Sequence, residues 1–212
     1  MKNVSPIGIF DSGVGGLSVL DQISQILPSE NLIYVADSKF APYGPMSSED
    51  VTRRAFNITN FLIEKHNIKL MVVACNTATA ACIKEMREKY CIPIIGMEPA
   101  VKPAIKSSKV KRIGILATEG TLKSAKFFAL IEHYDGEYQF YTKPCIGLVE
   151  LIERGKINTP QTIDLVHQYL SPLKHHNVDV IVLGCTHFYY VKKIVEEYFN
   201  GSVKVIDTGK AV

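Results

Sequence analysis

The amino-acid sequence predicts an α/β fold of two similar lobes with parallel-type sheets flanked by helices, related by a pseudo-twofold axis with a cleft between them. The first observation is that short apolar runs of strand length alternate with longer stretches of helical period, which is typical of βα units in a parallel sheet. The second is an internal repeat. IGIFDSG at residues 7–13 is echoed by IGILATEG at 113–120, and VVACNTA at 72–78 by VLGCTHF at 182–188. Because the paired motifs keep their order, each half of the chain is predicted to form one lobe.

The first half of the chain contains three predicted strand-helix pairs. The strands are expected at 7–10, 32–35 and 70–74, and the helices at 17–27, 48–66 and 78–89. The second helix is the clearest, because the apolar residues from Val51 to Leu62 recur at spacings of four, three and four and therefore share one face. Ser47, followed three residues later by Asp50, predicts a capped start for this helix.

The second half repeats this organisation. Strands are expected at 113–116, 138–141 and 178–183, with a helix at 121–131 and further helical stretches between the later strands. Pro93, Pro99 and Pro103 interrupt the pattern and mark residues 93–110 as the boundary region. We therefore expect the lobes to comprise residues 1–97 and 98–207.

Composition and charge exclude several classes of protein. The 212 residues are 47% hydrophobic and 21% charged, and the mean hydropathy is +0.09, which is typical of a globular protein. No run approaches about 18 consecutive apolar residues and no secretory hydrophobic region opens the chain, so we expect no membrane association and a cytoplasmic location. A net charge of +3 with scattered lysines predicts no nucleic-acid partner.

A glycine-rich turn, DSGVGG at residues 11–16, lies between the first predicted strand and helix. It has some features of a dinucleotide-binding turn, with Asp37 standing 22 residues after Gly15. However, Ser18 stands where a third small residue is required, and Asp11 would meet the pyrophosphate. A turn whose backbone N–H groups bind a small carboxylate at a helix N-terminus fits these residues better. The remaining alternative is a tight turn with Asp11 in solvent.

The cysteines provide the second chemical signal. Five cysteines without a CxxC pair predict reduced thiols, and a single buried cysteine is most simply part of a core. Cys75 and Cys185 differ from the others, because each ends an apolar strand and precedes polar residues that open a helix, where the thiol pKa can be lowered. Two such thiols facing one cleft suit a reaction at two mirror-related faces. Cys82, Cys91 and Cys145 are expected in the core.

These motifs resemble those of the cofactor-independent aspartate/glutamate racemase family, and of the glutamate racemases of bacterial cell-wall synthesis in particular. The resemblance covers nearly the whole chain and rests on FDSGVGGLS at 10–18, ADS at 36–38, PYG at 42–44, ACNTA at 74–78, Thr118 with Thr121, GCTH at 184–187 and IDT at 206–208. It implies two α/β lobes, neither pyridoxal phosphate nor a metal, and interconversion of L- and D-glutamate that supplies D-glutamate for peptidoglycan. It also allows a homodimer.

The resemblance implies roles for particular residues. Cys75 and Cys185 become the acid/base thiols, Asp11 assists the first, and His187 assists the second together with an acid from residues 148–153. Glu153, which precedes Arg-Gly, aligns better as this acid, and Glu150 is the alternative. The positions that resemble substrate-cleft residues are Asp11, Ser12, Pro42, Tyr43, Gly44, Cys75, Asn76, Thr77, Thr121, Cys185, Thr186 and His187.

Members of the family are usually longer. The resemblance therefore implies that residues from about 208 onward begin a segment that completes the first lobe, and that the chain as given is shortened. Alternative functions are a racemase for aspartate or another amino acid, a non-catalytic amino-acid-binding module, and a cysteine hydrolase. The last of these leaves Cys75 without a purpose.

Overall fold

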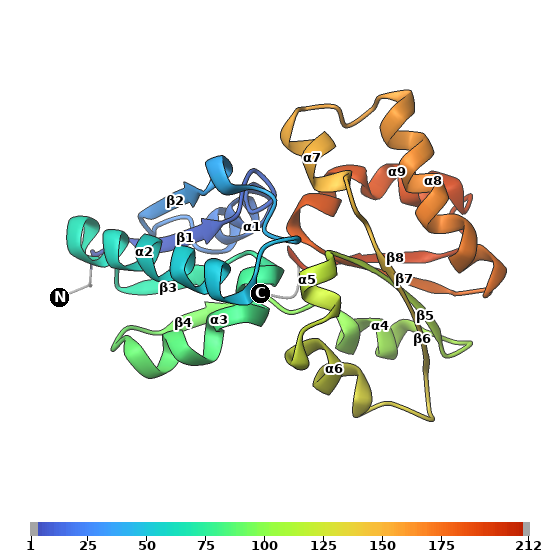
Figure 1. Cartoon of the computed structure of the whole chain (residues 1–212), viewed down its shortest axis with the longest axis horizontal. Coiled ribbons are helices and arrows are strands. Elements are labelled where there is room, and N and C mark those ends of the chain that lie inside the picture. Colours follow the sequence, from blue (N-terminus) through green and yellow to red (C-terminus); the bar gives the residue numbers. More distant parts are fainter. Residues whose placement is uncertain (1–3, 210–212) are drawn as a thin grey trace.

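The computed structural model describes residues 4–209, which fold into two lobes, each built around a four-stranded parallel sheet (Figure 1). The α/β fold class with two similar lobes is confirmed. Residues 210–212, part of the segment expected to complete the first lobe, lie outside the described residues. None of the helices within residues 4–209 is both long and apolar enough to cross a membrane.

The first sheet and its helices occupy the N-terminal half of the chain. In chain order the elements are β1 (Ile7–Asp11), α1 (Leu17–Ile26), β2 (Leu32–Ala36), the 3-10 helix η1 (Ser38–Phe40), α2 (Ser48–His66), β3 (Leu70–Val73), α3 (Asn76–Lys89) and β4 (Ile94–Gly96). Helix α2 begins as predicted, because the Ser47 side chain accepts a hydrogen bond from the Asp50 N–H at 3.1 Å.

The second half contains the remaining elements. They are α4 (Val101–Ser107), β5 (Arg112–Ala117), α5 (Glu119–Leu122), α6 (Ala125–Glu132), β6 (Gln139–Pro144), α7 (Leu148–Glu153), α8 (Pro160–His175), β7 (Val180–Gly184), the 3-10 helix η2 (Thr186–Val191), α9 (Lys192–Tyr198) and β8 (Lys204–Asp207).

The two sheets have the same strand topology. Their strand orders are β2-β1-β3-β4 and β6-β5-β7-β8, so β1 corresponds to β5 and β3 to β7. These are the two strand pairs that carry the repeated sequence motifs. Cys75 follows β3 and Cys185 follows β7, at the carboxyl ends of equivalent central strands. The predicted repeat is therefore present in the fold.

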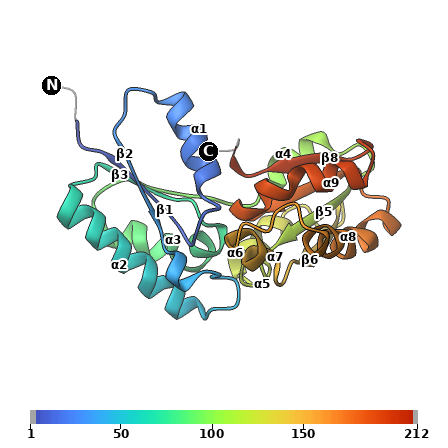
Figure 2. The same cartoon turned by 90° about the horizontal axis from the view of Figure 1, so that it is seen from above.

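Each sheet is covered on both faces. In the first lobe, α2 and α3 pack on one face and α1 on the other (Figure 2). In the second lobe, α7, α8 and α9 cover one face, and α4 and α6 cover the other. Helices on both faces explain why the central strands read as continuous apolar runs instead of alternating ones. The polar ends of these strands meet where the two lobes join.

Three details differ from the sequence-based expectations. The helix expected at 121–131 is two helices, because the Ser124 side chain accepts from the Phe127 N–H and starts α6 anew. The proline-marked region contains β4 and α4, which had not been expected. Cys91 is exposed, so its assignment to the core is wrong, whereas Cys82 and Cys145 are buried.

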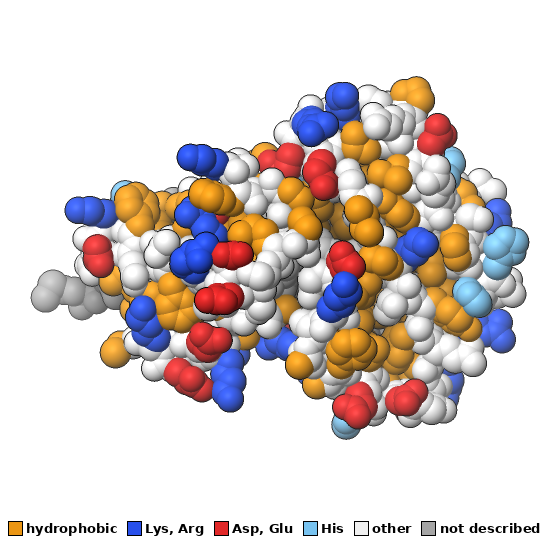
Figure 3. All heavy atoms as spheres, viewed as in Figure 1, with side chains coloured by type: hydrophobic (Ala, Val, Ile, Leu, Met, Phe, Trp, Pro, Cys, Tyr) orange, Lys and Arg blue, Asp and Glu red, His pale blue; other side chains and the backbone are white. Residues whose placement is uncertain are grey.

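Acidic and basic side chains are interspersed over the face shown in Figure 3. A groove of about 500 Å³ lies between the lobes, lined from the first lobe by residues that include Met46 and Thr77, and from the second by residues that include Glu119 and Lys126. Lys126 forms an ion pair with Glu98 at 2.9 Å.

Candidate active site

The glycine-rich turn after β1 binds two carboxylates of the protein itself. The Gly13 N–H donates to Asp11 Oδ2 at 3.1 Å, and the Val14 N–H donates to Glu153 Oε1 of α7 at 2.7 Å. Asp11 is fully buried, so the alternative in which it is solvated is wrong. Glycine is required at position 15, because a Cβ there would come within 2.6 Å of the His187 backbone nitrogen.

Cys75 lies at the N-terminus of α3 with its sulfur toward this turn. Its Sγ accepts from the Ala78 N–H at 3.5 Å, and the thiol donates to Ser12 Oγ at 3.6 Å. Burial raises the pKa of the thiol to about 12, and the nearby Asp11 carboxylate adds to the rise. The Ala78 N–H at the helix N-terminus lowers this pKa, as expected, but burial outweighs its effect, so the structure holds Cys75 as a neutral thiol.

Cys185 has a different environment. The His187 Nδ1 lies 3.8 Å from its sulfur, and the His187 Nε2 lies 2.5 Å from Glu153 Oε1. Burial alone lowers the pKa of His187, but hydrogen bonds with Cys185 and Glu153, together with the charge of Asp11, outweigh it and raise that pKa to about 10. Desolvation raises the pKa of Glu153, but its hydrogen bonds with His187 and Val14 leave it below its ordinary value. The structure therefore favours an imidazolium-carboxylate pair beside Cys185.

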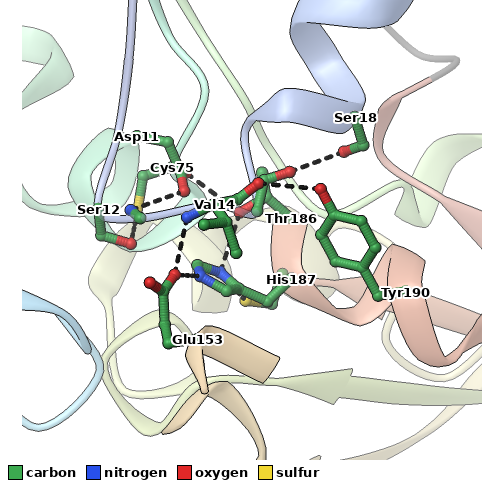
Figure 4. A network of polar contacts seen from close by, with 12 residues as sticks. Asp11, Ser12, Val14, Ser18, Cys75, Glu153, Thr186, His187 and Tyr190 are labelled. Carbon is green, nitrogen blue, oxygen red and sulfur yellow. Dashed lines mark hydrogen bonds and ion pairs between the residues drawn. The ribbon is translucent and has the colours of Figure 1, made fainter. Parts of the chain in front are cut away.

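A threonine joins the two halves of the site. The Thr186 hydroxyl donates to Asp11 Oδ1 at 3.1 Å and lies 3.4 Å from His187 Nδ1. Burial raises the pKa of Asp11, although the positive charge of His187 opposes the rise. Figure 4 shows the resulting network, which runs from Cys75 and Ser12 on the first lobe to Glu153 and His187 on the second.

A second cluster of predicted residues consists of hydroxyl groups at the lobe interface. Thr77 Oγ1 of α3 lies 2.8 Å from Thr118 Oγ1 and 3.3 Å from Thr121 Oγ1 of the other lobe. All three threonines are buried. The neighbouring Asn76 donates from its side chain to the Met97 carbonyl, and its Oδ1 is buried without a hydrogen-bond partner among the described residues. A buried acceptor of this kind suits a ligand that carries N–H donors.

The PYG segment forms a third group of predicted residues. Pro42 is half-buried next to Tyr43, whose hydroxyl donates to Asp37 Oδ2 at 2.5 Å. The Gly44 carbonyl accepts from the Gly120 N–H of the second lobe at 3.2 Å. Arg54 of α2 binds both oxygens of Asp37, at 2.8 and 2.6 Å. The segment is therefore fixed from both lobes.

The structure distinguishes the two candidate acids by position. Glu153 contacts His187, whereas Glu150 lines a separate cavity together with Pro42, Gly44 and Cys145. The sequence did not indicate Tyr34 and Tyr190, whose hydroxyls bind the glycine-rich turn. Thr118 was among the residues that carry the resemblance but was not assigned to the site. Within residues 4–209, no group of three or more His, Cys, Asp or Glu side chains is arranged to hold a metal ion.

Comparisons with known proteins agree with this geometry. A family model described as Asp/Glu/hydantoin racemase matches residues 7–212. The chain is 49% identical to the glutamate racemase of Ectopseudomonas mendocina over 212 residues, covering 100% of this chain and 80% of that protein. It is 49% identical to that of Pseudomonas aeruginosa strain PAO1 over 207 residues, covering 97% and 78%.

Solved structures give the same result. Escherichia coli glutamate racemase, determined with L-glutamate and the activator UDP-MurNAc-Ala, is 34% identical with a TM-score of 0.89, covering 97% of this chain and 79% of that one. A glutamate racemase from Bacillus anthracis is 34% identical with a TM-score of 0.88, covering 97% and 77%. An aspartate racemase from Picrophilus torridus, 22% identical with a TM-score of 0.66, shares the fold.

Proposed function

The chain belongs to the Asp/Glu/hydantoin racemase family, and from this premise we propose that it is a glutamate racemase that interconverts L- and D-glutamate by proton transfer between two cysteines. The observation that carries the proposal is the equivalent placement of Cys75 and Cys185 at the ends of β3 and β7, one on each lobe of a single network. The D-glutamate formed would supply peptidoglycan synthesis. A homodimer, which the resemblance allows, stays untested.

The proposed reaction needs one base and one acid on opposite faces of Cα. One cysteine, as the thiolate, takes the Cα proton and leaves a carbanion whose charge spreads into the substrate carboxylate. The other cysteine, as the thiol, gives its proton to the opposite face. The first sulfur is then a thiol and the second a thiolate, so the two cysteines exchange roles in the reverse direction.

The neighbouring groups would restore the starting protonation. In the described structure Cys75 is a neutral thiol, suited to donate, while Cys185 lies beside an imidazolium that can give a proton to the sulfur and take it back. We assign Asp11 to Cys75, and His187 with Glu153 to Cys185. Asp11 and His187 are linked through Thr186, which offers a path between the two sides.

Binding of the substrate is assigned to the remaining predicted residues. The hydroxyls of Thr77 and Thr121 and the backbone of the Gly44 segment can bind the substrate carboxylates through neutral hydrogen-bond donors. Asn76 Oδ1, which has no hydrogen-bond partner within residues 4–209, can accept from the substrate ammonium group. Ser12, Pro42 and Tyr43 would form the walls around it.

Glutamate is favoured over aspartate by the comparisons. The curated relatives named above are glutamate racemases at 49% identity, whereas the aspartate racemase shares only the fold at 22%. A non-catalytic binding module is distinguished by incubation with L-glutamate in heavy water. A racemase replaces the Cα hydrogen by deuterium and forms D-glutamate, whereas a binding module leaves L-glutamate unlabelled.

Substitution of either cysteine tests the mechanism. Cys75→Ala and Cys185→Ala are each expected to lower racemisation by at least about 1,000-fold while leaving the thermal unfolding temperature near that of the wild type, because no second group can replace either base. Cys91→Ala, at an exposed position, is the matched control and should keep full activity. Substantial racemisation by either cleft variant would contradict the two-base scheme.

A partial reaction separates the two cysteines. Elimination of a leaving group from a β-substituted amino acid requires only proton abstraction, so each variant should still process the enantiomer whose proton faces the remaining cysteine. We expect opposite enantiomer preferences for Cys75→Ala and Cys185→Ala, measured by release of the leaving group. The same preference in both variants would contradict the opposed placement.

A further inference from the structure

Side chains from both lobes form hydrogen bonds with the backbone N–H and carbonyl groups of Gly13 and Val14. The N–H groups bind Asp11 and Glu153, as described above, and the carbonyl groups accept hydrogen bonds from two tyrosines. The Tyr34 hydroxyl of β2 donates to the Gly13 carbonyl at 2.5 Å. The Tyr190 hydroxyl of η2 donates to the Val14 carbonyl at 3.0 Å, a contact drawn in Figure 4. The turn therefore links one tyrosine from each lobe to one carboxylate from each lobe.

Val14 is bound by two side chains of the second lobe, and its carbonyl also accepts from the Leu17 N–H at the start of α1 at 3.1 Å. Its N–H meets Glu153 of α7 and its carbonyl meets Tyr190, three residues after His187 in η2. His187 in turn contacts the same Oε1 atom of Glu153 that accepts from Val14. The contacts therefore form a ring that runs from Tyr190 through Val14 and Glu153 to His187, which lies on the same 3-10 helix as Tyr190. Removal of one contact leaves the other residues of the ring less constrained.

We propose that Tyr190 is a positioning residue for the His187-Glu153 pair, because its hydroxyl fixes the Val14 backbone and thereby keeps the Val14 N–H on the Glu153 carboxylate. Tyr34, from the first lobe, fixes the Gly13 backbone in the same way through its hydrogen bond to the Gly13 carbonyl. The effect of Tyr190 on the reaction rate rests on the proposed racemase function. Its effect on His187 does not, because that effect can be measured without substrate.

The consequence for His187 has a defined direction. The titratable groups that face its imidazole are Cys185 in the adjoining residues, Glu153 on α7 and Asp11 at the end of β1. The Val14 N–H stabilises the ionised form of Glu153, which in turn stabilises the imidazolium. If the turn is freed, Glu153 can move toward solvent and the imidazolium loses part of its stabilisation. The pKa of His187 should then fall.

The test compares Tyr190→Phe with Tyr189→Phe. Tyr189 is the adjacent tyrosine, its ring packs edge-on against that of Tyr190, and its side chain is 43% exposed. Both changes keep the ring and remove only a hydroxyl. NMR titration of the His187 imidazole, with its signal assigned by comparison with a His187→Gln spectrum, measures this shift. In Tyr190→Phe the His187 pKa should be lower than in the wild type by about half a unit or more, which corresponds to the loss of part of the energy of one hydrogen bond. In Tyr189→Phe the His187 pKa should not change. An unchanged His187 titration in Tyr190→Phe would overturn the proposal.

Kinetics separate positioning from direct substrate contact. Tyr190→Phe should lower kcat about fivefold, the rate equivalent of about 1 kcal/mol for one hydrogen bond, with little change in KM. A raised KM with unchanged kcat and His187 titration would make Tyr190 a substrate contact and overturn the proposal. If Tyr190→Phe does not fold, Tyr34→Phe replaces it with the same expected direction of the His187 shift. If the wild type fails to racemise glutamate, the proposed function fails, and the titration still decides this inference.

Discussion

Burial acts in opposite ways on two ionisable residues of the site. Cys75 has no cationic partner in the described part of the chain, and desolvation raises the pKa of its thiol and keeps it neutral. His187 is buried just as deeply, but its hydrogen bonds with Glu153 and Cys185 outweigh desolvation and keep it charged. The folded protein therefore holds a proton on both residues at neutral pH.

This difference predicts how stability depends on pH. The pKa of His187 rises from 6.5 to about 10 on folding, so the folded state binds this proton more tightly than the unfolded state. The resulting stabilisation is complete below pH 6.5 and is lost as the pH rises toward 10. Between pH 7 and 10, the free energy of unfolding should therefore fall more steeply for the wild type than for His187→Gln.

Urea unfolding at several pH values measures this slope. His133→Gln is the control, because His133 is an exposed histidine and its replacement should leave the slope unchanged. Parallel pH curves for the wild type and His187→Gln would show that His187 does not gain its proton on folding.

At the scale of a single element, α2 presents two adjacent arginines in different environments. Arg54 binds both oxygens of the buried Asp37, which also holds Tyr43, whereas Arg53 pairs with Asp50 at the surface. We expect Arg54→Met to lower the free energy of unfolding by about 2 kcal/mol, because it leaves a buried carboxylate without its cation. Arg53→Met should change it by less than about 0.5 kcal/mol.

Chemical denaturation of the two variants tests this difference, since both remove one guanidinium from the same helix. If the two variants lose the same free energy of unfolding, the Arg54-Asp37 pair contributes no more to stability than a surface ion pair does. A larger loss for Arg54→Met, together with weaker glutamate binding, would be expected if this pair also fixes the PYG segment.

The elements that the sequence predicted well are those with a strong local signal. Helix α2 has a regular apolar face and a capping serine, so its bounds match the expectation. The expected helix at 121–131 failed because its apolar period continues across Ser124, although that serine caps a new helix. Strand β4 is only three residues long and follows Pro93, too short a run for its periodicity to be read.

At the scale of the whole molecule, the sequence indicated which residues end the central strands but not how they meet. The repeat was enough to place Cys75 and Cys185 at equivalent positions. The contact between Asp11 and Thr186 joins residues 175 positions apart, and the Val14 contact with Tyr190 joins residues 176 apart. Such contacts depend on how the lobes pack, and Tyr190 carries no local pattern that distinguishes it from Tyr189.

The closed arrangement of the lobes predicts an order of thiol reactivity. Cys75 and Cys185 are 4% and 7% exposed, and Cys91 is exposed. Iodoacetamide should therefore modify Cys91 well before either cleft cysteine, as measured by mass spectrometry of peptides over time. Glutamate should slow modification of Cys75 and Cys185 further, without affecting Cys91. Modification of either cleft cysteine as fast as that of Cys91 would show that the lobes stand open in solution.

The unequal surroundings of the two cysteines have a thermodynamic consequence. Asp11 stands at the end of β1, but the equivalent position at the end of β5 is Ala117, and the second lobe takes its acid from α7 instead. The two halves of the site are therefore not mirror images, whereas the two enantiomers of glutamate have equal free energy in water. The Haldane relation then requires the same kcat/KM for L- and D-glutamate. If the asymmetry of the site makes kcat higher for one enantiomer, KM for that enantiomer must therefore be higher by the same factor.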